Sequence, residues 1–341
     1  MAHTHSVPLF SAAPARVPWR AVAVFAITAV VLAWLVALPL WLGGRGLADP
    51  LLPIVAAAMM FTPALATIPA LLVDRQGGGL RGARAVLRRL GMWPLRPIGR
   101  TIGWTAAMIF AMPLLVALSL VIAGALGFAQ FDLVGFSGFV AMLERTLPAG
   151  ATLPPAGLIV ALQVAAIPVA ALINIPFAFG EEVGWRGWLL PALRPLGVWP
   201  ALVLSGAFWG FWHAPLILLG YNFGEPNVLG VVMMIVGSAL IGVILGWTRL
   251  RTGSVWPAVL GHGAFNASAG MGALVVAADS SPLATLAGPI GVSMWIACLL
   301  VIAVMALCGA FRSSQLDGRL ADDPAQPAAS AQPAASARQT Q

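Results

Sequence analysis

The chain has 341 residues, of which 60% are hydrophobic and only 9% are charged. Soluble domains carry about 25% charged residues, so this composition excludes a water-soluble globule, and it is too apolar for a largely disordered chain. The net charge of +7 comes with arginine as its only basic residue, because the sequence contains no lysine. Basic residues beside apolar spans set membrane orientation, so we expect a lipid bilayer as partner and no nucleic acid.

Apolar runs of roughly 20 residues, long enough to cross about 30 Å of hydrocarbon, recur along the chain. They predict an all-α, polytopic membrane bundle of eight helices, with boundaries good to about ±4 residues. The predicted spans are Ala21–Leu42, Leu51–Val73, Thr101–Leu126, Ala156–Phe179, Pro200–Gly220, Val228–Trp247, Trp256–Ala277 and Leu283–Phe311. We expect the fourth helix to continue through Glu181 and Glu182 towards Leu190, because apolar and aromatic residues resume beyond the two carboxylates.

The distribution of arginine over the loops predicts the topology. With the N-terminus inside, sixteen of the eighteen arginines, including Arg186 and Arg249, fall on the cytoplasmic side. This bias predicts that both chain ends are cytoplasmic. The chain then divides into an N-terminal tail (1–20), a transmembrane bundle (21–311) and a C-terminal tail (312–341). Lysine-free, alanine- and arginine-rich usage suggests a bacterial source and therefore an inner membrane.

Two segments outside the spans have a composition of their own. Leu80–Trp93 mixes arginines with apolar residues and predicts a short helix on the anionic membrane surface. The C-terminal tail repeats the sequence AQPAAS at 325–330 and 331–336, which predicts disorder.

Cys298 and Cys308 lie ten residues apart on the last span, about 15 Å along a helix and too far for a disulfide.

Ionisable residues are costly inside a membrane, and they usually face the bundle interior and serve a function. The spans carry them in three motifs: GEEVGWR at 180–186, WGFWH at 209–213 and HGAFN at 262–266. Apart from His3 and His5 in the N-terminal tail, these motifs contain every histidine of the chain and two of its four glutamates. The three motifs therefore form the candidate site.

The spacing within the first motif separates its two glutamates. At 100° per residue, Glu182 and Arg186 lie about 40° apart on the helix face and one turn apart, so we expect an ion pair that supports the site. Glu181 lies about 140° from Arg186 and has no local partner. It is the candidate general base towards water, and a hydrogen bond to backbone or serine is the alternative for it.

The other two motifs supply donors and a histidine. His262 and Asn266 share a helix face, where two donors could hold the oxygen of a tetrahedral intermediate. Counted along the helices from their cytoplasmic ends, His262 lies about 9 Å deep and His213 about 20 Å, a mismatch for one site. The set suits metal-free amide hydrolysis. A zinc ion bound by Glu181, His213 and His262 is the alternative, although the HExxH spacing is absent.

The order of the three motifs resembles the CPBP group of intramembrane proteases. This group includes the type II CAAX prenyl endopeptidases and the Abi-like bacteriocin-immunity proteins. The similarity covers about 160–268, roughly a third of the chain. It implies water activation by Glu181 with His213, an oxyanion site from His262 and Asn266, and structural support from Glu182 and Arg186. Trp209 stands where the family usually has Phe, which keeps an aromatic wall and narrows the pocket.

We therefore expect an endopeptidase that cuts a membrane-associated peptide or protein near the cytoplasmic side. Its relatives are often catalogued as metalloproteases, although the residue set requires no cofactor. The alternative is a non-catalytic immunity or scaffold protein that binds a peptide or partner through the same cavity. A transporter with Glu181 and Glu182 as a proton relay is disfavoured, because the two halves of the chain share no repeated motif. The sequence predicts neither the substrate nor the oligomeric state.

Overall fold

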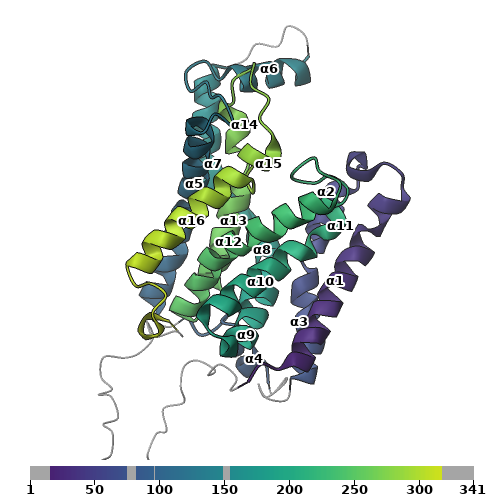
Figure 1. Cartoon of the computed structure of the whole chain (residues 1–341), viewed down its shortest axis with the longest axis vertical. Helices are drawn as coiled ribbons and strands as arrows, with labels where there is room; N and C mark the ends of the chain where they lie inside the picture. Colours follow the sequence, from purple (N-terminus) through teal and green to yellow (C-terminus); the bar gives the residue numbers. More distant parts are fainter. Residues whose placement is uncertain (1–15, 75–81, 96, 149–153, 317–341) are drawn as a thin grey trace, which may run out of the picture.

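The computed structural model describes residues 16–74, 82–95, 97–148 and 154–316, which fold into a bundle of helices (Figure 1). Within these ranges there is no strand, only a single antiparallel bridge between Phe131 and Val276. The predicted all-α class is confirmed. Residues 1–15 of the N-terminal tail and the two AQPAAS repeats lie outside the described residues.

Six helical segments of the described chain are long and apolar enough to cross a membrane. They are α1 (Trp19–Leu42), α2 with α3 (Leu52–Met59 and Thr62–Val73), α5 (Ile98–Ala125), α7 (Ala156–Ile173), α12 (Val228–Thr252), and α15 with α16 (Ala284–Ala287 and Val292–Leu307). The chain is therefore an integral membrane protein. The count of eight spans and the cytoplasmic placement of both ends stay predictions.

The predicted fifth and seventh spans are shorter and interrupted in the structure. The fifth consists of α10 (Val198–Trp212) and the single turn α11 (Ala214–Ile217). The seventh consists of α13 (Trp256–Ser268) and the short α14 (Met271–Val275). A proline two residues after His213 lacks the N–H that a continuous helix requires, which accounts for the first interruption. Each interruption lies within a few residues of a candidate site residue.

The fourth helix continues beyond the two glutamates, as predicted, but in several pieces. After α7 the chain turns at Asn174, whose Nδ2 donates to the carbonyl of Ala170 over 2.9 Å. The pieces that follow are α8 (Ile175–Glu182), the π-helix η2 (Val183–Leu189), α9 (Leu190–Leu193) and the 3-10 turn η3 (Arg194–Leu196). The π-helix thus begins directly after Glu182.

Helix α10 packs closely along α12 through two glycines four residues apart. A Cβ atom on Gly206 would lie 2.8 Å from Ala239 Cα, and one on Gly210 would lie 2.5 Å from Ile235 Cα. Small residues at this spacing allow the backbones of two membrane helices to approach each other. The contact fixes the end of α10, which is the end that carries His213.

Arg186 and Arg249 are wrongly assigned to cytoplasmic loops in the sequence analysis. Both are buried within the bundle, with 1% and 8% of their surface exposed. Their guanidinium groups bind acceptors inside the protein, so neither counts as a loop charge. The cytoplasmic side of the predicted topology then has fourteen arginines, sixteen less these two, against two on the other side.

The predicted surface helix at Leu80–Trp93 appears as α4 (Ala83–Arg89), a helix of seven residues. Arg89 at its end forms an ion pair with Asp74, and Leu90 is buried. Residues 80 and 81 lie outside the described residues. Contact of α4 with an anionic leaflet stays a prediction.

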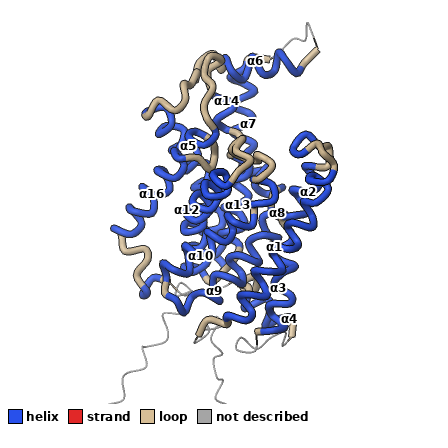
Figure 2. The backbone as a smooth tube through the Cα atoms, turned by 45° about the vertical axis from the view of Figure 1, so that its right-hand side comes forward, coloured by secondary structure: helices blue, strands red, loops and turns tan. Residues whose placement is uncertain are grey.

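The C-terminal tail begins later than predicted. After Arg312 the chain forms the turn η4 (Ser313–Gln315), and Leu316 is fully buried. Arg251 Nη1 donates to both the carbonyl and the side-chain oxygen of Gln315, each over 2.6 Å, which explains why these residues stay packed. Helix α1 starts and α16 ends at the end of the bundle where α4 and α9 lie, opposite α6 (Ser137–Thr146) (Figures 1 and 2).

Candidate active site

The two glutamates of the first motif are the last residues of α8, and Arg186 lies within the π-helix. π-Helical turns are rare and are frequently found at functional sites. Arg186 Nη1 donates to Glu182 Oε1 over 2.7 Å, and both side chains are buried. The predicted ion pair is confirmed, and it compensates the charge of a carboxylate that is removed from water.

Glu182 also joins the first motif to the third. The Nδ1 atom of His262, on α13, lies 2.9 Å from the same Glu182 Oε1 that binds Arg186. The carboxylate accepts, so His262 Nδ1 carries the proton and donates it. This contact links residues 80 positions apart in the chain, and helical spacing could not have indicated it.

Glu181 is held by the aromatic residue of the second motif. Trp209 Nε1 donates to Glu181 Oε2 over 2.6 Å, and only 2% of the Glu181 surface is exposed. The partner is therefore an indole N–H, where the sequence suggested backbone or serine as the alternative. This bond occupies the Oε2 atom of the carboxylate.

Trp209 contacts residues of all three motifs. Besides its bond to Glu181, its indole lies edge-to-face with the His262 ring, with centroids 5.2 Å apart, and its centroid is 5.8 Å from that of His213. The Arg186 guanidinium carbon lies 4.5 Å from the centre of the indole, a cation–π contact. Trp209 is therefore more than the aromatic wall that the sequence suggested.

The two histidines lie close to each other, although the counts along their helices differ. Both rings contact the same indole, with centroids 5.8 Å (His213) and 5.2 Å (His262) from that of Trp209. A count of residues gives distance along each helix axis, and this differs from depth in the membrane where helices are inclined or interrupted. The candidate site can thus hold both imidazoles around one substrate.

His213 is the more accessible of the two histidines. It directly follows α10, is half-buried, and packs edge-to-face on Trp212 with ring centroids 4.7 Å apart. Its Nδ1 lies 2.9 Å from the carbonyl oxygen of Trp209, which can only accept, so Nδ1 donates. In the neutral ring Nε2 then carries a lone pair, which can take a proton from water.

Asn266 lies one turn after His262 on α13, as the spacing predicted, and its side chain is half-buried. Glu181 and Glu182, when both ionised, carry two negative charges against the one positive charge of Arg186. A proton on His262 makes this cluster neutral. The protonated ring also gains an N–H at Nε2, which is the donor that the predicted oxyanion role requires beside the Asn266 amide.

The candidate zinc ligands Glu181, His213 and His262 each have one polar atom engaged within the protein. Among the residues that the structure describes, no three His, Cys, Asp or Glu side chains are grouped so that they could hold an ion. Zinc in catalytic sites takes three protein ligands at about 2.0–2.2 Å. Glu181, His213 and His262 instead direct one polar atom each to Trp209 or Glu182.

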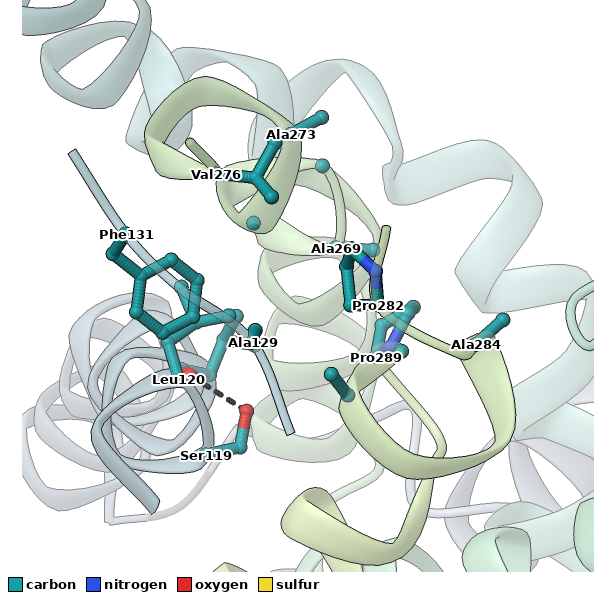
Figure 3. A pocket seen from close by; sticks show the side chains of 15 residues that line it. Ser119, Leu120, Ala129, Phe131, Ala269, Ala273, Val276, Pro282, Ala284 and Pro289 are labelled. Carbon is teal, nitrogen blue, oxygen red and sulfur yellow. Dashed lines mark hydrogen bonds between the residues drawn. The ribbon is translucent and has the colours of Figure 1, made fainter. Parts of the chain in front are cut away.

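A separate apolar cavity of about 330 Å³ lies beyond the end of α13 (Figure 3). Side chains from α5, from the turn between α13 and α14, and from the segment around α15 line it. Among the described residues that line it, only Ser119 has a polar side chain, and its hydroxyl already donates to the Val116 carbonyl over 2.7 Å. None of the predicted site residues lines this cavity, although it includes Ala269, three positions after Asn266.

Sequence reasoning missed two features of the site. The first is the hydrogen bond from Trp209 to Glu181, which the exchange of the usual Phe for Trp could have signalled, because Trp adds an N–H donor. The second is Arg249, which donates to the carbonyl of Arg186 over 3.1 Å behind the site. Its position at the predicted end of a span gave no sign that it is buried.

Comparison with known proteins agrees with the motifs. Residues 161–268 match the family model described as type II CAAX prenyl endopeptidase Rce1-like, and this segment contains all three motifs. A stretch of 90 residues is 29% identical to CAAX prenyl protease 2 of Methanococcus maripaludis, covering 25% of this chain and 33% of that protein. The chain therefore aligns with about a third of the length of this curated relative. The resemblance to CAAX-type intramembrane proteases is confirmed for this segment.

Proposed function

We propose that the protein is an intramembrane endopeptidase that hydrolyses a peptide bond of a membrane-associated substrate. The observation that carries this proposal is the buried Glu181 carboxylate, which accepts from Trp209, while the ring of Trp209 contacts those of His213 and His262. The match to CAAX-type proteases supports it. A bacterial inner membrane is the proposed location.

The proposed reaction begins with a water molecule between Glu181 and His213. Glu181 Oε1 takes a proton from the water, His213 Nε2 accepts a hydrogen bond from it, and the water oxygen attacks the scissile carbonyl carbon. General base catalysis of this kind contributes roughly 10²–10⁴-fold to the rate.

The negative charge that forms on the carbonyl oxygen is the second element of the mechanism. The Asn266 amide and the protonated His262 ring donate to this oxygen, and Glu182 with Arg186 keeps the ring in place. The proton held by Glu181 then passes to the leaving amine, which completes hydrolysis. No step requires a metal ion. Zinc held by Glu181, His213 and His262 is the rival mechanism.

The test uses the full chain in lipid nanodiscs with internally quenched, membrane-anchored peptides. The panel includes a prenylated peptide ending in a CAAX sequence, because the matched relative is named for such a substrate. Glu181→Gln, His213→Ala and His262→Ala are compared with Glu144→Gln, which changes an exposed carboxylate on α6. We expect at least a 100-fold loss of cleavage in the first three and none in the control.

Each of the other outcomes would support a different mechanism or a different function. Full activity in Glu181→Gln would exclude the proposed mechanism. Activity lost to a chelator and restored by zinc would establish the metal mechanism. A protein that binds a peptide or partner equally well without Glu181, and never yields a cleavage product, would be an immunity or scaffold protein. Where no panel peptide is cut, membrane proteins that change length on deletion of the gene identify the substrate.

A further inference from the structure

Arg249 lies in the last turn of α12, behind the proposed active site, and is buried. Its guanidinium donates to backbone carbonyls of three separate segments. Nε binds the carbonyl of Arg186 and Nη2 that of Arg89, each over 3.1 Å, and Nη1 binds that of Gly253. One side chain therefore joins the π-helix to the end of α4 and to the turn between α12 and α13.

The turn after α4 is shaped to receive this guanidinium. Gly91 has a φ of +71°, and a Cβ atom on it would lie only 2.7 Å from Arg249 Cζ. The same turn also binds the start of α13. The Gly91 carbonyl accepts from the Val255 N–H over 3.0 Å, and Trp256 Nε1 donates to the Met92 carbonyl over 3.0 Å. Arg249 thus lies at the junction of the segments that carry Arg186 and His262.

Arg186 connects Arg249 to the reactive groups. Its carbonyl accepts from Arg249, while its guanidinium donates to Glu182, which accepts in turn from His262. A shift of the π-helix would move Arg186 Nη1 relative to Glu182 Oε1 and would change the orientation of the His262 ring. Hydrogen bonds weaken steeply as their geometry departs from linear, so a small displacement is enough.

We propose that Arg249 is a positioning residue of the active site. It fastens the π-helix to the turn after α4 and so keeps Arg186, Glu182 and His262 aligned. Lysine cannot substitute for it, because a single ammonium group lacks the planar fork that reaches acceptors in three segments. The kinetic consequence rests on the proposed function, whereas the structural consequence can be measured without any substrate.

The structural test is hydrogen–deuterium exchange on the full chain in nanodiscs. Arg249→Lys keeps the positive charge but lacks the planar guanidinium that binds carbonyls of three segments. Its matched control is Arg251→Lys, two residues further on, which binds only Gln315 among the described residues. In Arg249→Lys we expect exchange to quicken together in 183–196 and in 86–95, by roughly tenfold. The control should leave both segments unchanged. Equal exchange in the two variants would overturn the proposal.

A second variant covers the case in which Arg249→Lys does not fold. Gly91→Ala keeps Arg249 but places a methyl group against its guanidinium. Gly99→Ala is the control, because a Cβ atom there meets nothing within 4 Å. Gly91→Ala should quicken exchange in the same two segments and Gly99→Ala in neither. Unchanged exchange of 183–196 in Gly91→Ala would refute the proposal that Arg249 holds the π-helix against the turn after α4.

The kinetic test uses whichever quenched peptide the wild-type protein cleaves. In Arg249→Lys we expect kcat to fall at least tenfold with KM within twofold, because alignment of the reacting groups is lost and substrate binding is kept. A kcat equal to that of Arg251→Lys would overturn the positioning role. If the wild type cleaves no peptide and no membrane protein changes length on deletion of the gene, the proposed function fails, and the exchange measurements still decide the role of Arg249.

Discussion

The indole N–H of Trp209 donates to the carboxylate of Glu181 over 2.6 Å, so a residue of α10 positions the candidate base on α8. The backbone carbonyl of the same tryptophan accepts from His213. The base and the histidine proposed to assist it are therefore held by two atoms of one residue. The rotamer of Trp209 determines whether its indole N–H reaches Glu181.

Trp209→Phe should lower kcat by roughly 10- to 100-fold while the fold is kept. The change removes a hydrogen bond to a charged group, worth about 1.5–3 kcal/mol, and retains the aromatic ring. About 1.4 kcal/mol corresponds to tenfold in rate. Cleavage of a quenched peptide measures the effect. Trp247→Phe is the control, because its indole donates to the Ala310 carbonyl, away from the site. An equal loss in both variants would argue against a specific role for the Glu181 contact.

Arg186→Met should destabilise the protein by about 3–5 kcal/mol, because it removes the guanidinium that pairs with the buried Glu182 carboxylate and leaves only His262 to bind it. Combined with Glu182→Gln, the same change should cost less than the two single changes added together. Reversible unfolding in SDS measures the three free energies. Strict additivity would show that Arg186 and Glu182 do not act as a unit.

Gly210→Ala should destabilise the contact between α10 and α12. The added Cβ would lie 2.5 Å from Ile235 Cα and 2.6 Å from the Met234 carbonyl oxygen, and backbone atoms of a packed helix cannot move aside freely. Overpacking of this kind costs about 1–3 kcal/mol. In Gly103→Ala, on α5, the new methyl group meets nothing within 4 Å, so stability should be equal or slightly higher. Thermal unfolding of both variants in nanodiscs tests the difference.

The turn before α6 should loosen only at strongly acidic pH. N–H groups of Gly135, Val134 and Ser137, together with the Ser137 hydroxyl, lower the pKa of Asp132 to about 2. A lowered pKa in the folded protein stabilises the turn above the unfolded value of about 3.9, and this contribution disappears as pH falls through about 2.

Hydrogen exchange of residues 131–140 measures the stability of this turn. The wild type and Asp132→Asn are compared at the same pH, because the pH dependence of intrinsic exchange is then equal in both. The wild type should be better protected above pH 4, and the difference should be much smaller near pH 2, where the Asp132 carboxylate is about half protonated. A difference as large at pH 2 as at pH 6, or no difference at pH 6, would contradict the assignment.

The sequence predicted local contacts of the candidate site better than non-local ones. The spacing of Glu182 and Arg186 is local, so helical geometry alone predicted their ion pair, and the structure confirms it. The contacts of Glu182 with His262 and of Glu181 with Trp209 join residues 80 and 28 positions apart. They depend on how α8, α10 and α13 pack, which periodicity does not encode.

The spans show the same division between local and non-local information. Hydropathy located the long apolar helices, because it sums over many residues. It gave no warning that α10 and α13 have only 15 and 13 residues or that a π-helix follows Glu182. Hydropathy also placed Arg249 in a loop. The hydropathy of an arginine near the end of an apolar run is the same whether its side chain points to solvent or to buried carbonyls.

The hydrogen bond between Glu182 and His262 has a consequence for the synthesis and membrane insertion of the protein. When the ribosome has just added Glu182, the histidine that completes the cluster is still 80 residues away. At about 5–20 residues per second, this interval lasts roughly 4–16 s. A nascent chain that has inserted only its first helices therefore lacks the third motif, and neighbouring polypeptides in the insertion machinery cannot meet a complete candidate site during that time.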